Sequence, residues 1–245
     1  MTKKFFFSAI KKTTLALPYI FVFSLSSIFL SHQQDQSIQM VLWDSIFGQI
    51  SAGNIETLVV SIKILGLIFL FSLLFGDYLS RYLGSVGSFV FVRISSRLQW
   101  SLRKIVNLYG LSALYTAILI GTELLISFRK VIRPSLDEST CMVLLILFAI
   151  LSTIFVSVCL IVNYLSIRHG ISVSLVITFL IVLILQVVSI LFYDVSANVL
   201  FNPFSFNSKI VDSLDYALIK IGIEFVYMGG ISCVLVRRIN KADIV

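Results

Sequence analysis

The sequence predicts an all-α, polytopic membrane protein with six transmembrane helices, and three observations lead to this fold class. Apolar residues make up 58% of the 245-residue chain and charged residues 13%, whereas soluble domains carry about 25% charged residues. The mean hydropathy is +1.03. The apolar residues are concentrated in runs of about 20, the length that a helix needs to cross a bilayer. Residues 1–245 are therefore expected to form a single transmembrane domain.

Six apolar runs are long enough to cross the membrane, and they lie at about 14–31, 57–76, 106–128, 141–166, 171–192 and 215–236. A backbone in lipid has no water to bond with, so each run is expected to be a helix. Since six is even, both termini lie on one side. Of the Lys and Arg residues outside the spans, including those of the two terminal segments, 13 lie on that side and 4 on the other. Because cytoplasmic loops are enriched in these residues, we expect a multi-pass plasma-membrane protein with both termini in the cytoplasm.

The net charge of +7 is explained by the same pattern. The basic residues flank the spans, where they set the orientation of the chain and attract anionic headgroups. The expected partner of this charge is therefore the lipid bilayer, and no nucleic acid is expected to bind.

The first span, 14–31, follows a basic start and could be a secretory signal. The best cleavage point, after Ser31, has Phe29 where a small residue is needed, so we interpret the run as a retained helix. The preceding stretch KKFFFSAIKK alternates basic residues with phenylalanines, which is typical of an amphipathic helix in the membrane interface.

The external connection 193–214 is too apolar for a solvated loop, and Asn202-Pro203 divides it into two pieces. Exposed irregular backbone is not tolerated in lipid. We therefore expect this segment either to dip into the outer leaflet or to pack against the spans.

The cytoplasmic connection 77–105 contains the stretch FVRISSRLQWSLRKI, residues 91–105. At 100° per residue this stretch forms an amphipathic helix along the membrane surface. Its apolar stripe, expected to lie on the membrane, consists of Phe91, Ile94, Leu98, Leu102 and Ile105. Its second stripe, expected to face away, consists of Arg93, Arg97, Trp100 and Lys104. The helix could be a charge cluster that only sets topology, or it could dock a cytoplasmic protein, because Arg and Trp are enriched at protein interfaces.

The layout of spans and connections, together with the piece FVFVRISSRLQWSLRKI, resembles the ABC-2 type permeases, which are the membrane subunits of ATP-binding-cassette exporters. The piece is similar to an aromatic-Arg-x-x-Ser-Arg-x-x-Trp segment of small permeases of Gram-positive bacteria, including those near bacitracin- and lantibiotic-resistance exporters. The likeness of layout covers nearly the whole chain, and the motif covers about 15 residues.

The resemblance implies a function in antibiotic resistance or bacteriocin immunity. It makes 77–105 a coupling segment whose contacts with a cytoplasmic ABC ATPase subunit are Arg93, Arg97, Trp100 and Lys104. It also implies a second permease subunit, identical or related. The chain lacks the G-x-x-x-x-G-K-[ST] phosphate loop, so ATP and Mg are expected on the partner chain and no cofactor on this one.

Four ionisable residues lie inside the spans, where a charge costs about 2.5–3.5 kcal/mol to insert. Lys63 and Glu123 lie at similar depths and could either pair across helices or extend outward to water. Lys220 and Glu224 are four residues apart and can neutralise each other on one helix face. All four are candidates for a substrate path, Glu224 foremost, although a structural pair facing a partner subunit remains an equal alternative for Lys220 and Glu224.

Catalytic patterns are missing from the sequence. His32 and His169 have no partner at metal-ligand spacing, and no G-x-S-x-G elbow occurs. We therefore expect neither an enzyme nor a metal site.

The leading expectation is an exporter permease that moves an amphipathic cargo, a peptide antibiotic, bacteriocin or lipid, by alternating access driven by a separate ATPase. The alternative is a substrate-binding membrane component of an uptake transporter, which should carry a more polar external pocket. A membrane enzyme or a channel is a third class, for which the sequence shows neither catalytic groups nor a lining ring.

Overall fold

The computed structural model describes residues 12, 14, 16–22, 46, 55–80, 96–130, 137–192, 201–204 and 214–241. In these ranges the regular structure is helical and no strand occurs. Four helices are long and apolar enough to cross a membrane: α6 (Arg97–Lys130), α7 (Glu138–His169), α8 (Ile171–Leu191) and α11 (Leu214–Lys241). The 21-residue helix α3 (Ile55–Phe75) contains a shorter apolar stretch, Ile62–Phe75. The prediction of an all-helical membrane protein is confirmed at this level.

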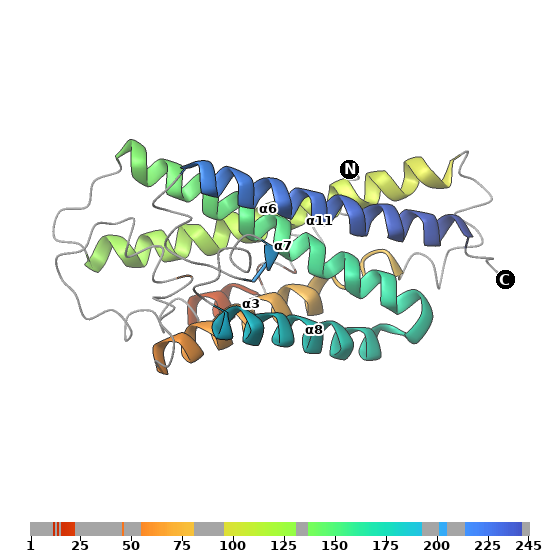
Figure 1. Ribbon diagram of the computed structural model, residues 1–245, viewed down its shortest axis with the longest axis horizontal. Helices are drawn as coiled ribbons and strands as arrows, with labels where there is room; N and C mark the ends of the chain where they lie inside the picture. Colours follow the sequence, from red (N-terminus) through yellow and green to blue (C-terminus); the bar gives the residue numbers. More distant parts are fainter. Residues whose placement is uncertain are drawn as a thin grey trace.

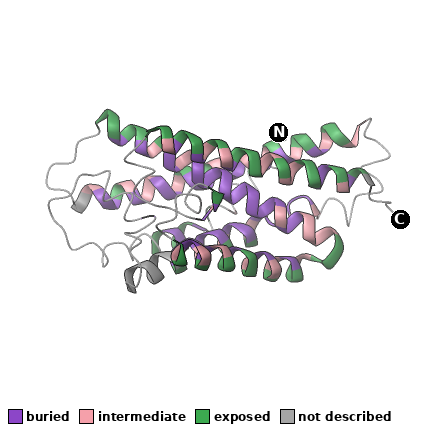
Figure 2. Cartoon of the chain, in the orientation of Figure 1, coloured by how far each residue is buried: buried purple, intermediate pink, exposed green. Residues whose placement is uncertain are grey.

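Consecutive helices alternate in direction. In Figure 1, α3, α7 and α11 run one way along the long axis, and α6 and α8 run the opposite way. Helix α7 packs against each of the other four helices. Its apolar span is 72% buried, whereas those of α8 and α11 are each 22% buried, and Figure 2 shows the same contrast. The centre of the bundle is therefore α7, and α8 and α11 present most of their surface outward.

A cluster of aromatic rings joins α3, α6 and α7 at the core. The ring of Phe71 lies 5.1 Å from that of Tyr115 and 5.2 Å from that of Phe155. All three side chains are at most 1% exposed. The Tyr115 hydroxyl donates a hydrogen bond to the carbonyl of Leu67 at 3.3 Å, which gives its polar end a partner inside the bundle.

Small polar side chains bring α6 and α7 together. The Ser112 hydroxyl donates to the carbonyl of Ser152 across the two helices at 2.7 Å. The hydroxyl of Thr153 instead bonds to the carbonyl of Ala149 in its own helix. A buried hydroxyl in lipid needs such a partner. These contacts fit helix packing rather than catalysis.

Helices α7 and α8 are joined by a single residue, Gly170, with φ of 76°. Its N–H donates to the carbonyl of Ser166 and closes α7, and its carbonyl accepts from the N–H of Ser174 in α8. A positive φ is readily adopted only by glycine. The chain therefore reverses direction through a one-residue connection, and α7 and α8 form a tight antiparallel pair.

Residues 97–105 correct one sequence-based expectation. They were expected to belong to a separate helix along the membrane surface, but they are the first turns of α6 and continue without a break to Lys130. No Gly or Pro lies between Arg97 and Tyr109, so helical hydrogen bonding propagates into the apolar span. The polar start of this helix extends the span predicted at 106–128.

One end of the bundle collects the basic residues. Lys12 donates to the carbonyl of Leu74 at the end of α3 at 2.7 Å. Arg97, at the start of α6, donates to the carbonyl of Asn240 at the end of α11 at 3.4 Å. The first contact places Lys12 beside the end of α3, and the second places the start of α6 beside the end of α11.

Candidate functional site

Residues 201–204, here called the strap, enter the bundle from the connection between α8 and α11. Figure 1 shows them as a short blue segment close to α7. Asn202 is 7% and Phe204 5% exposed. Asn202 and Phe204 therefore pack against the spans, whereas Phe201 is exposed. The rest of the segment 193–214 lies outside the described residues apart from its last residue, Leu214.

Hydrogen bonds from two helices hold the strap. The Asn202 side-chain amide donates to the carbonyl of Leu185 in α8 at 2.8 Å. Lys220 Nζ donates to the Asn202 carbonyl at 2.5 Å, and the Tyr227 hydroxyl donates to the Phe201 carbonyl at 2.7 Å. The backbone carbonyls that a proline-broken segment cannot use in a helix are thereby satisfied by side chains.

The strap reaches far into the membrane-spanning part of the bundle. Tyr227 is thirteen residues beyond the first residue of α11, which is about 20 Å along the helix at 1.5 Å per residue. The hydrocarbon core of a bilayer is about 30 Å thick. Irregular backbone at such depth is tolerated only where protein buries it or where it lines a cavity, and such segments often mark binding sites.

A cavity of about 300 Å³ lies beside the strap and is the candidate site. Its lining comes from α7, α8, the strap and α11, and consists of Ile154, Ser157, Val158, Ile161, Ile181, Val182, Leu185, Phe201, Asn202, Pro203, Phe204, Glu224, Tyr227 and Ile231. Most of these side chains are apolar. A concave apolar site with a few polar groups is the usual form of a small-molecule site.

Glu224 is the charged side chain in this lining. It is 1% exposed, and its Oε1 lies 3.3 Å from Nζ of Lys220, which is 0% exposed. The pairing within α11 that the spacing predicts is confirmed. The separation is that of an ion pair, but neither oxygen of Glu224 accepts a hydrogen bond of good geometry from the described residues.

The other intramembrane pair lies apart from this cavity. Lys63 Nζ in α3 donates to Glu123 Oε1 in α6 at 2.7 Å, with side-chain exposures of 2% and 0%. Of the two alternatives left by the sequence, pairing across helices is confirmed. Neither residue lines the cavity beside the strap, so the structure does not bring the four substrate-path candidates together.

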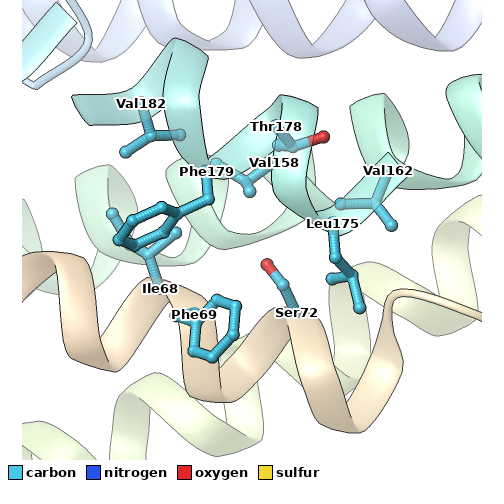
Figure 3. A pocket seen from close by; sticks show the side chains of 9 residues that line it. All are labelled: Ile68, Phe69, Ser72, Val158, Val162, Leu175, Thr178, Phe179 and Val182. Carbon is cyan, nitrogen blue, oxygen red and sulfur yellow. The ribbon is translucent and has the colours of Figure 1, made fainter. Parts of the chain in front are cut away.

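Two other cavities are less suited to a polar ligand. Figure 3 shows one between α3, α7 and α8, with the rings of Phe69 and Phe179 in edge contact at 5.4 Å. Its volume of about 10 Å³ is the room of a single water. A second cavity, of about 470 Å³ between α6 and α7, is lined by Ala117, Ile120, Gly121, Leu124, Cys141, Leu144, Leu145 and Phe148 and has no charged side chain.

The residues expected to dock an ATPase lie at the basic end, but their side chains do not all face away. Arg97, Trp100 and Lys104 are half-buried, and Arg93 lies outside the described residues. Lys104 Nζ lies 5.3 Å from the ring centre of Tyr78 and 5.8 Å from that of Trp100. The expected outward stripe is therefore turned partly toward the bundle, because these residues start a bundle helix rather than a surface helix.

The exposed side chains of this region are Leu98, Gln99, Leu102 and Arg103, here called the α6 entry surface. From the sequence, Arg103 was expected only to contribute to the charge balance, and Leu98 and Leu102 were expected to lie on the membrane. Ser157 and Tyr227 were missed as cavity residues, because nothing in their local sequence separates them from the other small or aromatic residues of the spans. The sequence signals at this cavity were Glu224, named as a substrate-path candidate, and the Asn202-Pro203 break.

The apolar lining, the Glu224 carboxylate and the Ser157 hydroxyl give the site groups that can bind a small molecule. In the described ranges no cluster of three His, Cys, Asp or Glu side chains could hold a metal ion. No protein-family model matches the chain, and no curated protein or solved structure is significantly similar to it.

Proposed function

We propose that this chain is the transmembrane permease subunit of an ATP-binding-cassette exporter in a bacterial plasma membrane. In this proposal six spans cross the bilayer, both termini are cytoplasmic, and an amphipathic cargo such as a peptide antibiotic, a bacteriocin or a lipid is moved outward. The resemblance to the ABC-2 type permeases motivates the proposal. The observation that carries it is a basic end with an exposed patch at the start of α6, which a cytoplasmic partner could reach.

The basic end supports the orientation. Arg103, Arg168 and Arg237 are exposed there, and Arg238 lies 4.9 Å over the ring of Tyr164, linking α11 to α7. An excess of Lys and Arg on one side is the signature of the cytoplasmic face. Helices α3, α6, α7, α8 and α11 alternate in direction, which also agrees with serial crossing of a membrane.

The turn after α3 links the start of α6 to the central helix, because Lys104 Nζ in α6 lies 5.3 Å from the ring centre of Tyr78. Asn163 in α7 accepts hydrogen bonds from the N–H groups of Leu79 at 2.8 Å and Ser80 at 3.1 Å. Its amide donates to the carbonyl of Cys159 at 2.7 Å. The chain leading from α3 toward α6 is therefore tied to the central helix. Movement at the entry surface would reach α7, which lines the cavity.

Alternating access would then use this connection. An ATPase subunit that binds ATP and Mg closes, and its motion passes through the start of α6 to the bundle and to a second permease subunit. The apolar lining of the cavity beside the strap favours export of an amphipathic molecule over uptake of a polar one. The alternative of an uptake component would need the more polar pocket that the described residues do not form.

The test is co-purification of the full chain with an ATPase expressed from the neighbouring gene. We expect Arg103→Glu to reduce ATPase recovery at least tenfold, because it reverses an exposed charge on the α6 entry surface. Arg97→Glu and Trp100→Ala should also reduce recovery, in part through lost contacts within the bundle. The matched control is Glu138→Lys, which makes a charge change of the same size and opposite sign at an exposed site at the opposite end of the bundle.

Two outcomes would contradict the proposal. If the parent chain recovers no ATPase, the permease assignment is wrong. If Arg103→Glu, Arg97→Glu and Trp100→Ala all recover as much ATPase as the parent, the docking surface is elsewhere. Circular dichroism and size-exclusion profiles of each variant separate lost docking from lost folding.

A further inference from the structure

The cavity beside the strap contains unused hydrogen-bond acceptors. Glu224 is 1% exposed and lines the cavity. Its Oε1 lies 3.3 Å from Lys220 Nζ in an ion pair, but neither carboxylate oxygen accepts a hydrogen bond of good geometry from the described residues. An ionised carboxylate can accept about four hydrogen bonds, and leaving buried acceptors unfilled is unfavourable. The carboxylate is therefore placed to accept a hydrogen bond from a molecule that enters the cavity.

A second polar atom lines the same cavity from another helix. The Ser157 hydroxyl in α7 has no hydrogen-bond partner among the described residues, and the residue is 8% exposed. Other serines of this helix, such as Ser152 and Ser166, bond to carbonyls of the preceding turn. Ser157 thus differs from them and offers the cavity both a donor and an acceptor.

The charge balance excludes ions as good ligands. Lys220 lies 3.3 Å from Glu224, so the pair is neutral as a unit. A cation at Glu224 would lie close to the ammonium group of Lys220, and an anion would lie close to the carboxylate. Either ion would add an uncompensated charge to an apolar cavity, which is costly. A neutral group that donates a hydrogen bond meets neither penalty.

Size and position indicate the rest of the ligand. A volume of about 300 Å³ is the room of roughly ten water-sized groups at about 30 Å³ each. Three lining residues are exposed at the rim: Ile181 by 38%, Phe201 by 58% and Tyr227 by 37%. They come from α8, the strap and α11, whose outer surfaces are apolar. The cavity therefore opens toward the surface that these helices present to lipid.

We propose that the cavity beside the strap binds an uncharged amphipathic molecule that enters sideways from the membrane. Its apolar part, of about ten heavy atoms, occupies the lining of α7, α8 and α11. Its polar end, a hydroxyl or an amide N–H, donates a hydrogen bond to Glu224 and meets the hydroxyl of Ser157. Calling this molecule the cargo rests on the proposed function, whereas its binding is measured without the ATPase.

The test uses the full chain in lipid nanodiscs and a diazirine-bearing 1-decanol as a photoreactive probe. We expect labelling of the cavity lining from α8, the strap and α11. Unlabelled 1-decanol should compete at least tenfold better than decyl methyl ether, which lacks the donor, or decylammonium, which is charged, at equal concentration in the membrane. Equal competition by the ether, or stronger competition by the ammonium, would overturn the proposal.

Paired substitutions make the test specific. The double variant Lys220→Met/Glu224→Leu removes the acceptor without leaving a lone charge, and it should abolish the preference for the alcohol. The matched control is Lys63→Met/Glu123→Leu, which removes the other buried pair and should keep the preference. A preference that survives in the first double variant contradicts the role of Glu224.

Ser157→Ala decides the matter if the first double variant does not fold, because it removes only one hydroxyl. We expect about fivefold weaker competition by 1-decanol in this variant, and unchanged competition would overturn the proposal. The two proposals also fail separately. Selective alcohol binding without ATPase recovery would support the binding site and contradict the permease assignment. ATPase recovery without selective alcohol binding would support the permease assignment and contradict the binding site.

Discussion

Two buried Lys–Glu pairs show that the same residue types have different roles in this bundle. Lys63 and Glu123 come from α3 and α6, and their hydrogen bond is 2.7 Å long. Lys220 and Glu224 are four residues apart in α11, at 3.3 Å, and Glu224 accepts no hydrogen bond from the described residues. The first pair joins two helices, and the second lies beside a cavity.

The difference teaches that burial and charge balance alone do not define a site. All four side chains are at most 2% exposed. What separates the pairs is the direction of the hydrogen bonds: Lys63 donates to its own partner, whereas Lys220 donates to the strap carbonyl of Asn202. As a result Glu224 keeps acceptor capacity that Glu123 uses within the protein.

Breaking the pair between α3 and α6 should have the largest effect. We expect Lys63→Met alone to lower the free energy of unfolding by about 3–5 kcal/mol, because it leaves Glu123 as a buried charge without its partner. The double variant Lys63→Met/Glu123→Leu should recover most of this loss. Unfolding by SDS in mixed micelles, followed by tryptophan fluorescence, measures both. Equal stability of the single and double variants would show that the pair is not a coupled unit.

Glu224→Leu should have a smaller effect, about 1–3 kcal/mol, because the ammonium group of Lys220 loses its counter-ion but not its other contacts. Lys220 keeps its hydrogen bond to the strap, and the adjoining cavity can admit water to the ammonium group. The same unfolding experiment, with Glu123→Leu run in parallel, measures the difference. If Glu224→Leu costs as much as Glu123→Leu, the contrast between the two pairs is wrong.

Tyr227→Phe should have the smallest effect, about 0.5–1.5 kcal/mol for one hydrogen bond. The variant loses the bond from the hydroxyl to the Phe201 carbonyl, so the strap should loosen locally. Hydrogen exchange at the amide of Phe204, which donates to Asn202 Oδ1, should become faster. The amides of Leu79 and Ser80, held by Asn163, provide the internal reference and should not change. Faster exchange at both places would indicate a global rather than a local change.

The helices of the C-terminal half agree closely with the sequence. The runs predicted at 171–192 and 215–236 correspond to α8 and to most of α11. Long apolar runs bounded by charged residues or glycine leave few alternatives in a membrane. The start of α6 was misplaced, because an amphipathic pattern is the same whether the helix lies on a surface or begins a span.

The candidate site was predictable only in fragments. The spacing of Lys220 and Glu224 predicted their pairing, because residues four apart share a helix face. The pairing of Lys63 with Glu123 stayed open, since sequence spacing does not say which helices are neighbours. No local sequence pattern indicated that Ser157 lines the cavity. Its role depends on its hydroxyl having no hydrogen-bond partner among the described residues, which only the structure shows.

The sequence by itself determined that the chain is a helical membrane protein, where most of its long apolar helices lie, and that its basic residues are concentrated in alternate connections between the apolar runs. These properties follow from composition and from the need of a backbone in lipid to satisfy its own hydrogen bonds. The tertiary structure decided that α7 is central, that Lys63 meets Glu123, and that the strap opens a cavity at Glu224. Such features depend on contacts between residues far apart in the chain, which no local pattern encodes.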